Sequence, residues 1–218
     1  MTPEILLVRH GQAQSAAQDE ASYDSLSPQG QEQARRLGAW LAENEPPPAR
    51  ITSGALQRQR QTAALIGEAM GLAPEVDPRL DELDYFGLSA DANARHALPF
   101  PTSRETFLTH LPQIMAAWAE GRIDTPRESH ADFEARIRSV LDEAAATRVM
   151  LVTSGGVIAM AMKLAMELSV TAFSHVALQI ENSSLHRLVP GQGHLRLDLF
   201  NGLPHLSDAE GRALRSHV

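Results

Sequence analysis

The segment Ile5–Gly11 constrains the fold of this 218-residue chain more than any other part of its sequence. Four consecutive apolar residues precede Arg9, His10 and Gly11. Such a run is typical of a strand buried on both faces, with its polar residues at the carboxyl end. Open α/β sheets bind their ligands at that end. The segment therefore predicts both the central strand of a sheet and the place of a functional site.

The three residues after the apolar run have complementary chemistry. His10 can act as a nucleophile through an imidazole nitrogen, and Arg9 can hold an anionic oxygen in its planar fork. Gly11 lets the backbone turn without a Cβ in the way. A nucleophile beside a cation points to phosphoryl transfer. A single histidine after a strand is more often structural, however, so the remaining parts of such a site must come from elsewhere in the chain.

The region after the first strand alternates between helix and strand patterns. Ser27 followed by Pro28 is typical of a helix start, and an apolar stripe continues the helix to about Glu43. A short strand is expected over residues 49–53, and a second helix over 56–70. The order strand, helix, strand, helix predicts a parallel sheet with helical crossovers.

The middle of the chain carries an acidic cluster and an irregular composition. Leu80–Asp84 places three carboxylates within four residues. Residues 89–102 turn to Ala, Asp, Asn and Pro, which predicts a loop-rich segment over one end of the sheet. An amphipathic helix follows over 107–118, kinked or restarted at a proline. We expect a single domain spanning residues 1–218, with residues 85–127 forming a cap.

A second strongly apolar strand is predicted over Arg148–Thr153. Ser154, Gly155 and Gly156 follow it, and an apolar helix then runs over about 157–168. A glycine turn at a helix N-terminus presents backbone N–H groups and the positive end of the helix dipole, which suits an anion. The same pattern also fits a plain tight turn between strand and helix, and the sequence leaves both open.

The composition limits the partners. The formal net charge of −8 provides no broad cationic surface for nucleic acid or an acidic membrane, so a phosphate site must be a local cluster that binds a small ligand. The chain has no cysteine, which excludes disulfides and thiolate metal sites. The first strand begins within five residues of Met1, and no apolar stretch has the length of a membrane span. We therefore expect a cytoplasmic protein, and a homodimer through an apolar helix face stays open.

Several motifs occur in one order along nearly the whole chain. They are Leu7–Gln12, Leu26–Gly30 with Gln33 and Ala34, Ser53 with Leu56 and Arg58, Gln61–Ala63, Leu80 with Glu82 and Gly87, Glu128 with Ser129 and Phe133, and Ser154–Ile158. Together they resemble the histidine phosphatase superfamily, which includes phosphoglycerate mutases and many phosphatases. The resemblance implies an α/β three-layer sandwich: a mostly parallel central sheet flanked by helices, with a helical cap insertion. The cap is its least recognisable part.

The resemblance also implies roles for individual residues. His10 would be the nucleophile that accepts the phosphoryl group, and Arg9 and Arg58 would grip its oxygens. Glu82 would protonate the leaving oxygen and then activate water. Such a scheme needs neither a metal nor a cofactor, because guanidinium groups and a carboxylic acid supply the charge and the proton. Two alternatives remain: Arg58 could be a solvated helix residue, and Glu82 could belong to a solvated acidic turn.

One position departs from the family pattern. Where the family normally carries a second histidine before Gly-Gly, this chain has Ser154, which can donate a hydrogen bond but carries no charge. We expect Ser154 and Gly155 to contact the phosphate together with the arginines. Losing one positioned donor costs on the order of 10²–10³ in rate.

The sequence thus predicts a phosphomonoesterase acting on a small phosphorylated metabolite through a phosphohistidine at His10. Two alternatives stay open. One is mutase-type phosphotransfer between phosphoglycerates. The other is a protein that binds a phosphorylated ligand or inorganic phosphate, its catalysis weakened by Ser154.

Overall fold

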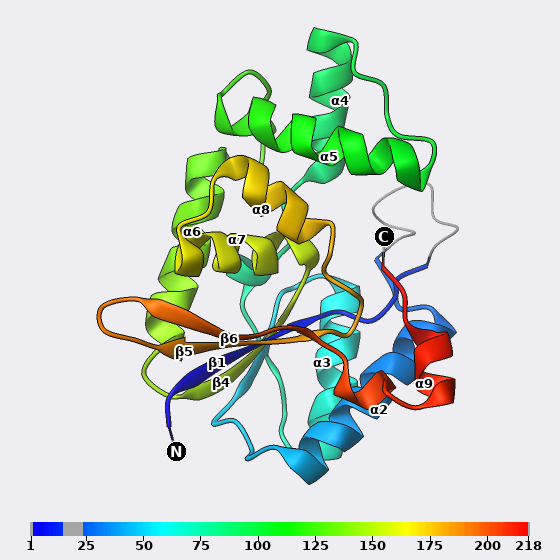
Figure 1. Ribbon diagram of the computed structural model, residues 1–218, viewed down its shortest axis with the longest axis vertical. Helices are drawn as coiled ribbons and strands as arrows, with labels where there is room; N and C mark the ends of the chain where they lie inside the picture. Colours follow the sequence, from blue (N-terminus) through cyan, green and yellow to red (C-terminus); the bar gives the residue numbers. More distant parts are fainter. Residues whose placement is uncertain (1, 15–23, 218) are drawn as a thin grey trace.

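A six-stranded sheet with helices on both faces forms the centre of the computed structural model, which describes residues 2–14 and 24–217 (Figure 1). The strand order is β3-β2-β4-β1-β5-β6. The first four of these strands run parallel, and β5 and β6 are antiparallel at one edge. The strands are β1 (Glu4–Arg9), β2 (Ile51–Ser53), β3 (Glu75–Val76), β4 (Arg148–Thr153), β5 (Leu185–Pro190) and β6 (Leu195–Gly202). The predicted fold class, with its mostly parallel central sheet, is confirmed.

Strand β1 divides the core into two halves. Ile5 and Leu7 belong to the larger apolar cluster, which includes residues of α5, α6, α7 and α8. Leu6 and Val8 belong to the smaller one, formed with α2 and α3. All four side chains are buried, because alternate residues of a strand face opposite sides of the sheet. The uninterrupted apolar run therefore reflects a strand covered on both faces.

The helices occupy three regions of the molecule. In Figure 1, α2 and α3 lie on one side of the sheet, α6, α7 and α8 on the other, and α4 and α5 beyond its end. Their bounds are α2 (Pro28–Asn44), α3 (Gln57–Met70), α4 (Tyr85–His96), α5 (Arg104–Ala119), α6 (His130–Ala144), α7 (Gly155–Met166), α8 (Val170–Ala177) and α9 (Ala209–Leu214). The starts of α2 and α3 agree with the sequence prediction to within one residue.

The loop-rich segment expected over residues 89–102 is wrong in its first half, which belongs to helix α4. Asp84 caps this helix: its Oδ1 accepts a hydrogen bond of 3.0 Å from the backbone N of Gly87. Leu88 is fully buried on its inner face. This cap and the buried apolar side of the helix stabilise α4, although its many polar residues leave no clear helical spacing of apolar residues in the sequence. Helices α4 and α5 both fall within the predicted cap, and the role of that segment as a cap stays a prediction.

Two further helix boundaries differ from those expected. Helix α5 continues through Pro112 without restarting there, and the kink predicted as the alternative stays a prediction. The apolar helix expected over 157–168 begins two residues earlier and ends at Met166, and α8 follows it as a separate element. Ser169 caps α8 by accepting a hydrogen bond of 3.2 Å from the backbone N of Ala172. That cap starts a new helix directly after the end of α7.

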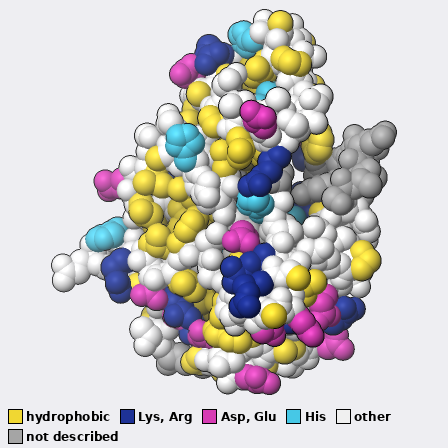
Figure 2. All heavy atoms as spheres, turned by 45° about the vertical axis from the view of Figure 1, so that its right-hand side comes forward, with side chains coloured by type: hydrophobic (Ala, Val, Ile, Leu, Met, Phe, Trp, Pro, Cys, Tyr) yellow, Lys and Arg dark blue, Asp and Glu magenta, His cyan; other side chains and the backbone are white. Residues whose placement is uncertain are grey.

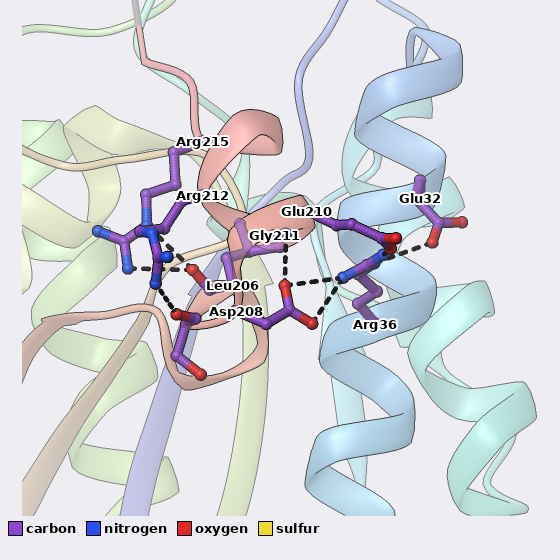
Figure 3. A network of polar contacts seen from close by, with 9 residues as sticks. Glu32, Arg36, Leu206, Asp208, Glu210, Gly211, Arg212 and Arg215 are labelled. Carbon is purple, nitrogen blue, oxygen red and sulfur yellow. Dashed lines mark hydrogen bonds and ion pairs between the residues drawn. The ribbon is translucent and has the colours of Figure 1, made fainter.

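Helix α9 near the end of the chain is joined to α2 by polar contacts (Figure 3). Arg36 reaches Glu32 and Glu210, with N–O distances of 3.0 Å to each. Gln33 of α2 donates a 2.6 Å hydrogen bond to the carbonyl oxygen of Leu214. Exposed ion pairs contribute little each. The buried amide of Gln33 therefore fixes the place of this segment more firmly than the surface charges do.

The surface mixes charges of both signs. On the face shown in Figure 2, Lys and Arg side chains are interspersed with Asp and Glu and do not gather into one basic patch. Within residues 2–14 and 24–217, no helix combines the length and apolar character required to cross a bilayer.

Candidate active site

Five of the six predicted site residues line one cavity of about 230 Å³. Arg9, the last residue of β1, and His10 come from one strand end. Gly155 starts α7, just after β4, the strand that pairs with β1 in parallel. Arg58 comes from the start of α3, and Glu82 from the connection before α4. The structure thus gathers residues from four regions of the chain at the carboxyl end of the sheet, while their chemical roles stay predictions.

His10 is buried, and one hydrogen bond fixes its tautomer. Its Nδ1 lies 2.7 Å from the carbonyl oxygen of Gly11. Because a carbonyl oxygen only accepts, Nδ1 must carry a proton, and in the neutral ring the lone pair is then on Nε2. Burial lowers the pKa of His10 well below its ordinary value, and the charges of Arg58 and Arg9 lower it further. The imidazole is therefore neutral at pH 7, in the form that a nucleophile requires.

The turn after His10 is held against α3. The backbone N of Gly11 donates a 3.1 Å hydrogen bond to the Oγ1 of Thr62. The same hydroxyl donates a 2.8 Å hydrogen bond to the carbonyl oxygen of Arg58. A Cβ at Gly11 would lie 2.3 Å from the carbonyl oxygen of Gly30. This position therefore requires glycine for close backbone approach, and the turn links the histidine to the helix that carries Arg58.

Both arginines of the cavity are held by partners within the chain. Arg9 donates through Nη1 to the carbonyl oxygen of Ile180. Arg58 is 2% exposed and pairs through Nη1 with Asp24 at 3.1 Å. Arg60, two residues further along α3, is exposed and is not part of the cavity wall. Two buried guanidinium groups beside a neutral histidine make this place suitable for an oxyanion.

The sequence interpretation missed Asp24. Its carboxylate accepts hydrogen bonds from the backbone N of Gln57 at 2.9 Å and of Arg58 at 3.2 Å. It therefore caps the first turn of α3 and holds the Arg58 side chain at the same time. No local pattern could identify it, because the helix that it caps begins more than thirty residues later.

Glu82 is the one carboxylate among the cavity-lining residues that the structure describes. Its Oε2 accepts a hydrogen bond of 3.0 Å from the backbone N of Gly156. Its Oε1 accepts a second hydrogen bond, also of 3.0 Å, from the backbone N of Leu83. A Cβ at Gly156 would lie 2.3 Å from Oε1, so this glycine makes room for the carboxylate. Each oxygen keeps a lone pair for a proton or a water molecule.

The other carboxylates of the acidic cluster serve the fold. Asp81 accepts a 2.5 Å hydrogen bond from the backbone N of Ala55, and burial raises its pKa. Asp84 caps α4. Neither lines the cavity. Among the three acidic residues, the geometry therefore favours Glu82 for proton transfer.

Ser154 does not line the cavity. It is 1% exposed, and its Oγ accepts a 2.8 Å hydrogen bond from the Nε2 of Gln59, which also donates 3.1 Å to the carbonyl oxygen of Leu80. The phosphate contact predicted for Ser154 stays a prediction, and Gln59 competes for the same hydroxyl. Sequence reasoning missed Gln59, because its position on α3 reads as an ordinary helix residue.

No other histidine of the described ranges lines the cavity beside His10. His186 is fully buried, and its Nε2 lies 2.9 Å from the Oγ of Ser184. His130 and His175 also lie outside the cavity wall. Among the described lining residues, the ionisable groups beside the proposed phosphate site are therefore His10, the two arginines and Glu82.

The rest of the cavity wall is largely apolar and comes from three regions. They are the start of α4 with the residues before it, helix α5, and helix α8 with the residues after it. The side chains are Leu83, Tyr85, Phe86, Phe107, Leu108, Leu111, Met115, Phe173, Ala177, Leu178 and Ile180.

Comparison with known proteins places this fold among phosphatases and phosphoglycerate mutases. A probable phosphoglycerate mutase, GpmB, from Klebsiella pneumoniae is 29% identical over 198 residues, which cover 85% of this chain and 84% of that protein. The structure of a mycobacterial glucosyl-3-phosphoglycerate phosphatase is 27% identical with a TM-score of 0.63, covering 92% of this chain and 99% of that one. A phosphoglycerate mutase from Bacillus anthracis shares the fold at 21% identity and a TM-score of 0.66, covering 96% of each chain.

The family assignment rests on the length of the match together with the site. The model of the histidine phosphatase superfamily (branch 1) matches residues 5–202, which include every residue that lines the cavity. Its members among the compared proteins carry the names of both phosphatases and mutases. This chain belongs to the histidine phosphatase superfamily.

Proposed function

We propose that the protein is a phosphomonoesterase that hydrolyses a small phosphorylated metabolite through a phosphohistidine at His10. The observation that carries the proposal is the state of this side chain: a buried, neutral imidazole, protonated at Nδ1, in a cavity with two buried arginines. The similarity to a mycobacterial phosphatase supports hydrolysis as the overall reaction.

In the first step, the Nε2 of His10 attacks the phosphorus atom. The bond between phosphorus and the ester oxygen breaks, and its electron pair goes to that oxygen, which takes a proton from the Glu82 carboxyl group. Arg9 and Arg58 offset the negative charge on the equatorial oxygens of the phosphoryl group. The proton stays on Nδ1, and its hydrogen bond to the carbonyl oxygen of Gly11 stabilises the positive ring that forms.

In the second step, water attacks the phosphorus atom of the phosphohistidine. Glu82 accepts a proton from this water, the bond from phosphorus to Nε2 breaks, and its electron pair returns to the imidazole. The hydrogen bonds from Gly156 and Leu83 hold the carboxylate in one orientation for both proton transfers. His10 ends neutral, and Glu82 ends protonated, as each began the cycle.

Release of inorganic phosphate tests this proposal. A generic aryl phosphate and a panel of phosphorylated metabolites are incubated with the wild type, His10→Ala and His175→Ala, the last replacing an exposed histidine outside the cavity. We expect His10→Ala to lose at least about a thousandfold in rate, because the nucleophile is gone, and His175→Ala to retain full activity. Equal release by His10→Ala and the wild type would refute the proposal.

Two observations favour other functions, and each of these functions has its own test. The similarity to GpmB favours mutase-type transfer, which interconversion of phosphoglycerates without net phosphate release would reveal. The neutral Ser154, bound to Gln59, favours a protein that binds phosphorylated ligands with little turnover. In that case inorganic phosphate should raise the melting temperature while no substrate of the panel is hydrolysed.

A further inference from the structure

The cavity beside His10 has charge at one end only. Arg9 and Arg58 are the cationic side chains of its wall in the part of the chain that the structure describes, and both belong to the proposed phosphate site. Away from this end the wall is made of aliphatic and aromatic side chains from α4, α5 and α8. A substrate whose phosphoryl group reaches His10 therefore places its remaining atoms against an apolar surface.

The one polar side chain of the apolar wall is already satisfied. The hydroxyl of Tyr85 lies 2.8 Å from the Nδ1 of His110. Burial raises the pKa of Tyr85 to about 12, so the phenol carries no charge at neutral pH. Among the described residues that line this part of the cavity, a carboxylate or a second phosphate on the substrate would meet no cation, and removing such a group from water without a partner is unfavourable.

Contacts between aromatic rings hold the wall in shape. The ring of Tyr85 packs edge to face against Phe86 and Phe107, with centroid distances of 6.1 and 5.5 Å. Phe86 in turn stacks on Phe100 at 5.6 Å, with an angle of 19° between the rings. The wall is therefore formed before a ligand arrives, and flat or branched apolar groups can pack on it without ordering mobile side chains.

We propose that the physiological substrate class is the monophosphate of an apolar alcohol, aromatic or branched aliphatic, with no second charged group. This inference rests on the proposed function for its chemistry and adds the nature of the leaving group. It distinguishes the protein from an enzyme that acts on phosphoglycerates, because the carboxylate of such a substrate would find no cation among the described residues of the apolar wall. Recognition would come from apolar contact, with the phosphoryl group supplying the charge.

A series of alcohol monophosphates tests the proposal. Ethyl, butyl, hexyl and benzyl phosphate are compared with 3-phosphoglycerate, because all of them release an alcohol and differ mainly in what contacts the wall. We expect kcat/KM to rise about fourfold per buried methylene along the alkyl series. We also expect benzyl phosphate to exceed 3-phosphoglycerate by at least about tenfold. A 3-phosphoglycerate value equal to or above that of benzyl phosphate would overturn the inference, while His10-dependent release would keep the phosphatase proposal intact.

A pair of variants locates the selectivity. Leu108 lines the cavity and is 39% exposed, so a lysine there can be introduced at the mouth without opening the core. Leu108→Lys should lower kcat/KM for benzyl phosphate and raise it for 3-phosphoglycerate, each about threefold, by adding a partner for the carboxylate. Thr109→Lys, at the next and also exposed position of α5, does not line the cavity and should change neither value. Equal effects of the two variants on selectivity would contradict the inference.

Binding provides a test that is independent of turnover. The melting temperature is measured with benzylphosphonate and with 3-phosphonopropionate, neither of which can be hydrolysed. We expect benzylphosphonate to stabilise the protein at lower concentration, and the reverse order would overturn the inference. If no substrate is hydrolysed, the proposed function fails, and the order of these two ligands still decides the chemistry of the cavity.

Discussion

The chemical state of His10 is set by groups that the local sequence does not identify. The run of apolar residues before it predicts that it follows a buried strand, but not which ring nitrogen carries the proton. The carbonyl oxygen of Gly11 fixes the tautomer of His10. The charge of Arg58, which lies on helix α3, helps to lower the pKa of His10. The position could therefore be predicted from the sequence, while the protonation state required the three-dimensional arrangement.

A direct consequence concerns the pKa of His10. Replacing Arg58 by Gln removes one of the charges that lower it, so the pKa of His10 should rise, while burial should still hold it below its ordinary value of 6.5. The ring nitrogen signals in NMR spectra, followed as a function of pH, measure this in the wild type and the variant without relying on activity. Protonation of His10 near pH 6.5 in the wild type would contradict the account.

The pairing of Ser154 with Gln59 has its own consequence. Gln59 is fully buried, and its amide lies against the position where the family carries a histidine. Ser154→His alone should overpack this space and destabilise the fold by about 1–3 kcal/mol, without a gain in rate. Combined with Gln59→Ala, it should raise the rate by up to about 10²–10³, because an added donor can then reach the phosphoryl group.

Phosphate release and chemical unfolding of the two variants, with Gln59→Ala as the control, measure these effects. The same gain in rate from Ser154→His with and without Gln59→Ala would show that Gln59 does not fill this space.

The elements that a sequence pattern could predict are those with a long apolar period or an obvious cap. Helix α2 has Ser27 and Pro28 at its start, and β4 is a run of apolar residues. Helix α4 was missed because its single deeply buried leucine sits among polar and small residues. Helix α9 was missed because its position depends on contacts with α2 that span most of the chain.

The two glycines at the start of α7 should respond differently to substitution. At Gly156 a Cβ would lie 2.3 Å from Glu82, whereas at Gly155 the nearest atom, the Nε of Arg9, would be 3.8 Å away. Gly156→Ala should therefore lower stability by about 1–3 kcal/mol and shift the Glu82 carboxylate, reducing the rate at least about tenfold. Gly155→Ala should preserve the fold, because alanine also favours helix.

Thermal unfolding and phosphate release compare the pair directly. Equal losses of stability in both variants would mean that Gly156 is not required to make room for Glu82.

At the scale of the whole molecule, buried neutral histidines make stability depend on pH. Burial lowers the pKa of His186 from 6.5 to about 3, and that of His205 to about 4. Below pH 6.5 the unfolded chain binds protons that the folded chain excludes, so stability present above pH 6.5 is lost as the pH falls towards these values. Each such histidine should cost about 1 kcal/mol per pH unit in this range.

Urea unfolding at several pH values between 7 and 5 measures this slope. His186→Gln removes one of the groups and should reduce the slope by about one proton, whatever its effect on stability at pH 7. The exposed position His175→Gln serves as the control. An unchanged slope in His186→Gln would show that this histidine does not resist protonation in the fold.

The site as a whole is a product of topology. Arg9, Arg58, Glu82 and Gly155 lie far apart in the sequence, and a parallel sheet brings the ends of β1 and β4 together. Motif order could therefore predict which residues meet. The partners that orient them, such as Asp24 and Gln59, come from contacts without a local pattern, and only the folded chain reveals them.

Trapping the covalent phosphohistidine at His10 would show the proposed intermediate itself. The protein is mixed with 4-nitrophenyl phosphate, quenched in base within one turnover, and its peptides are mapped by mass spectrometry. We expect a phosphoryl group on the peptide that contains His10 in the wild type, and none on the corresponding peptide of His10→Ala. Phosphate release by the wild type with no phosphoryl group on His10 at any time would contradict it.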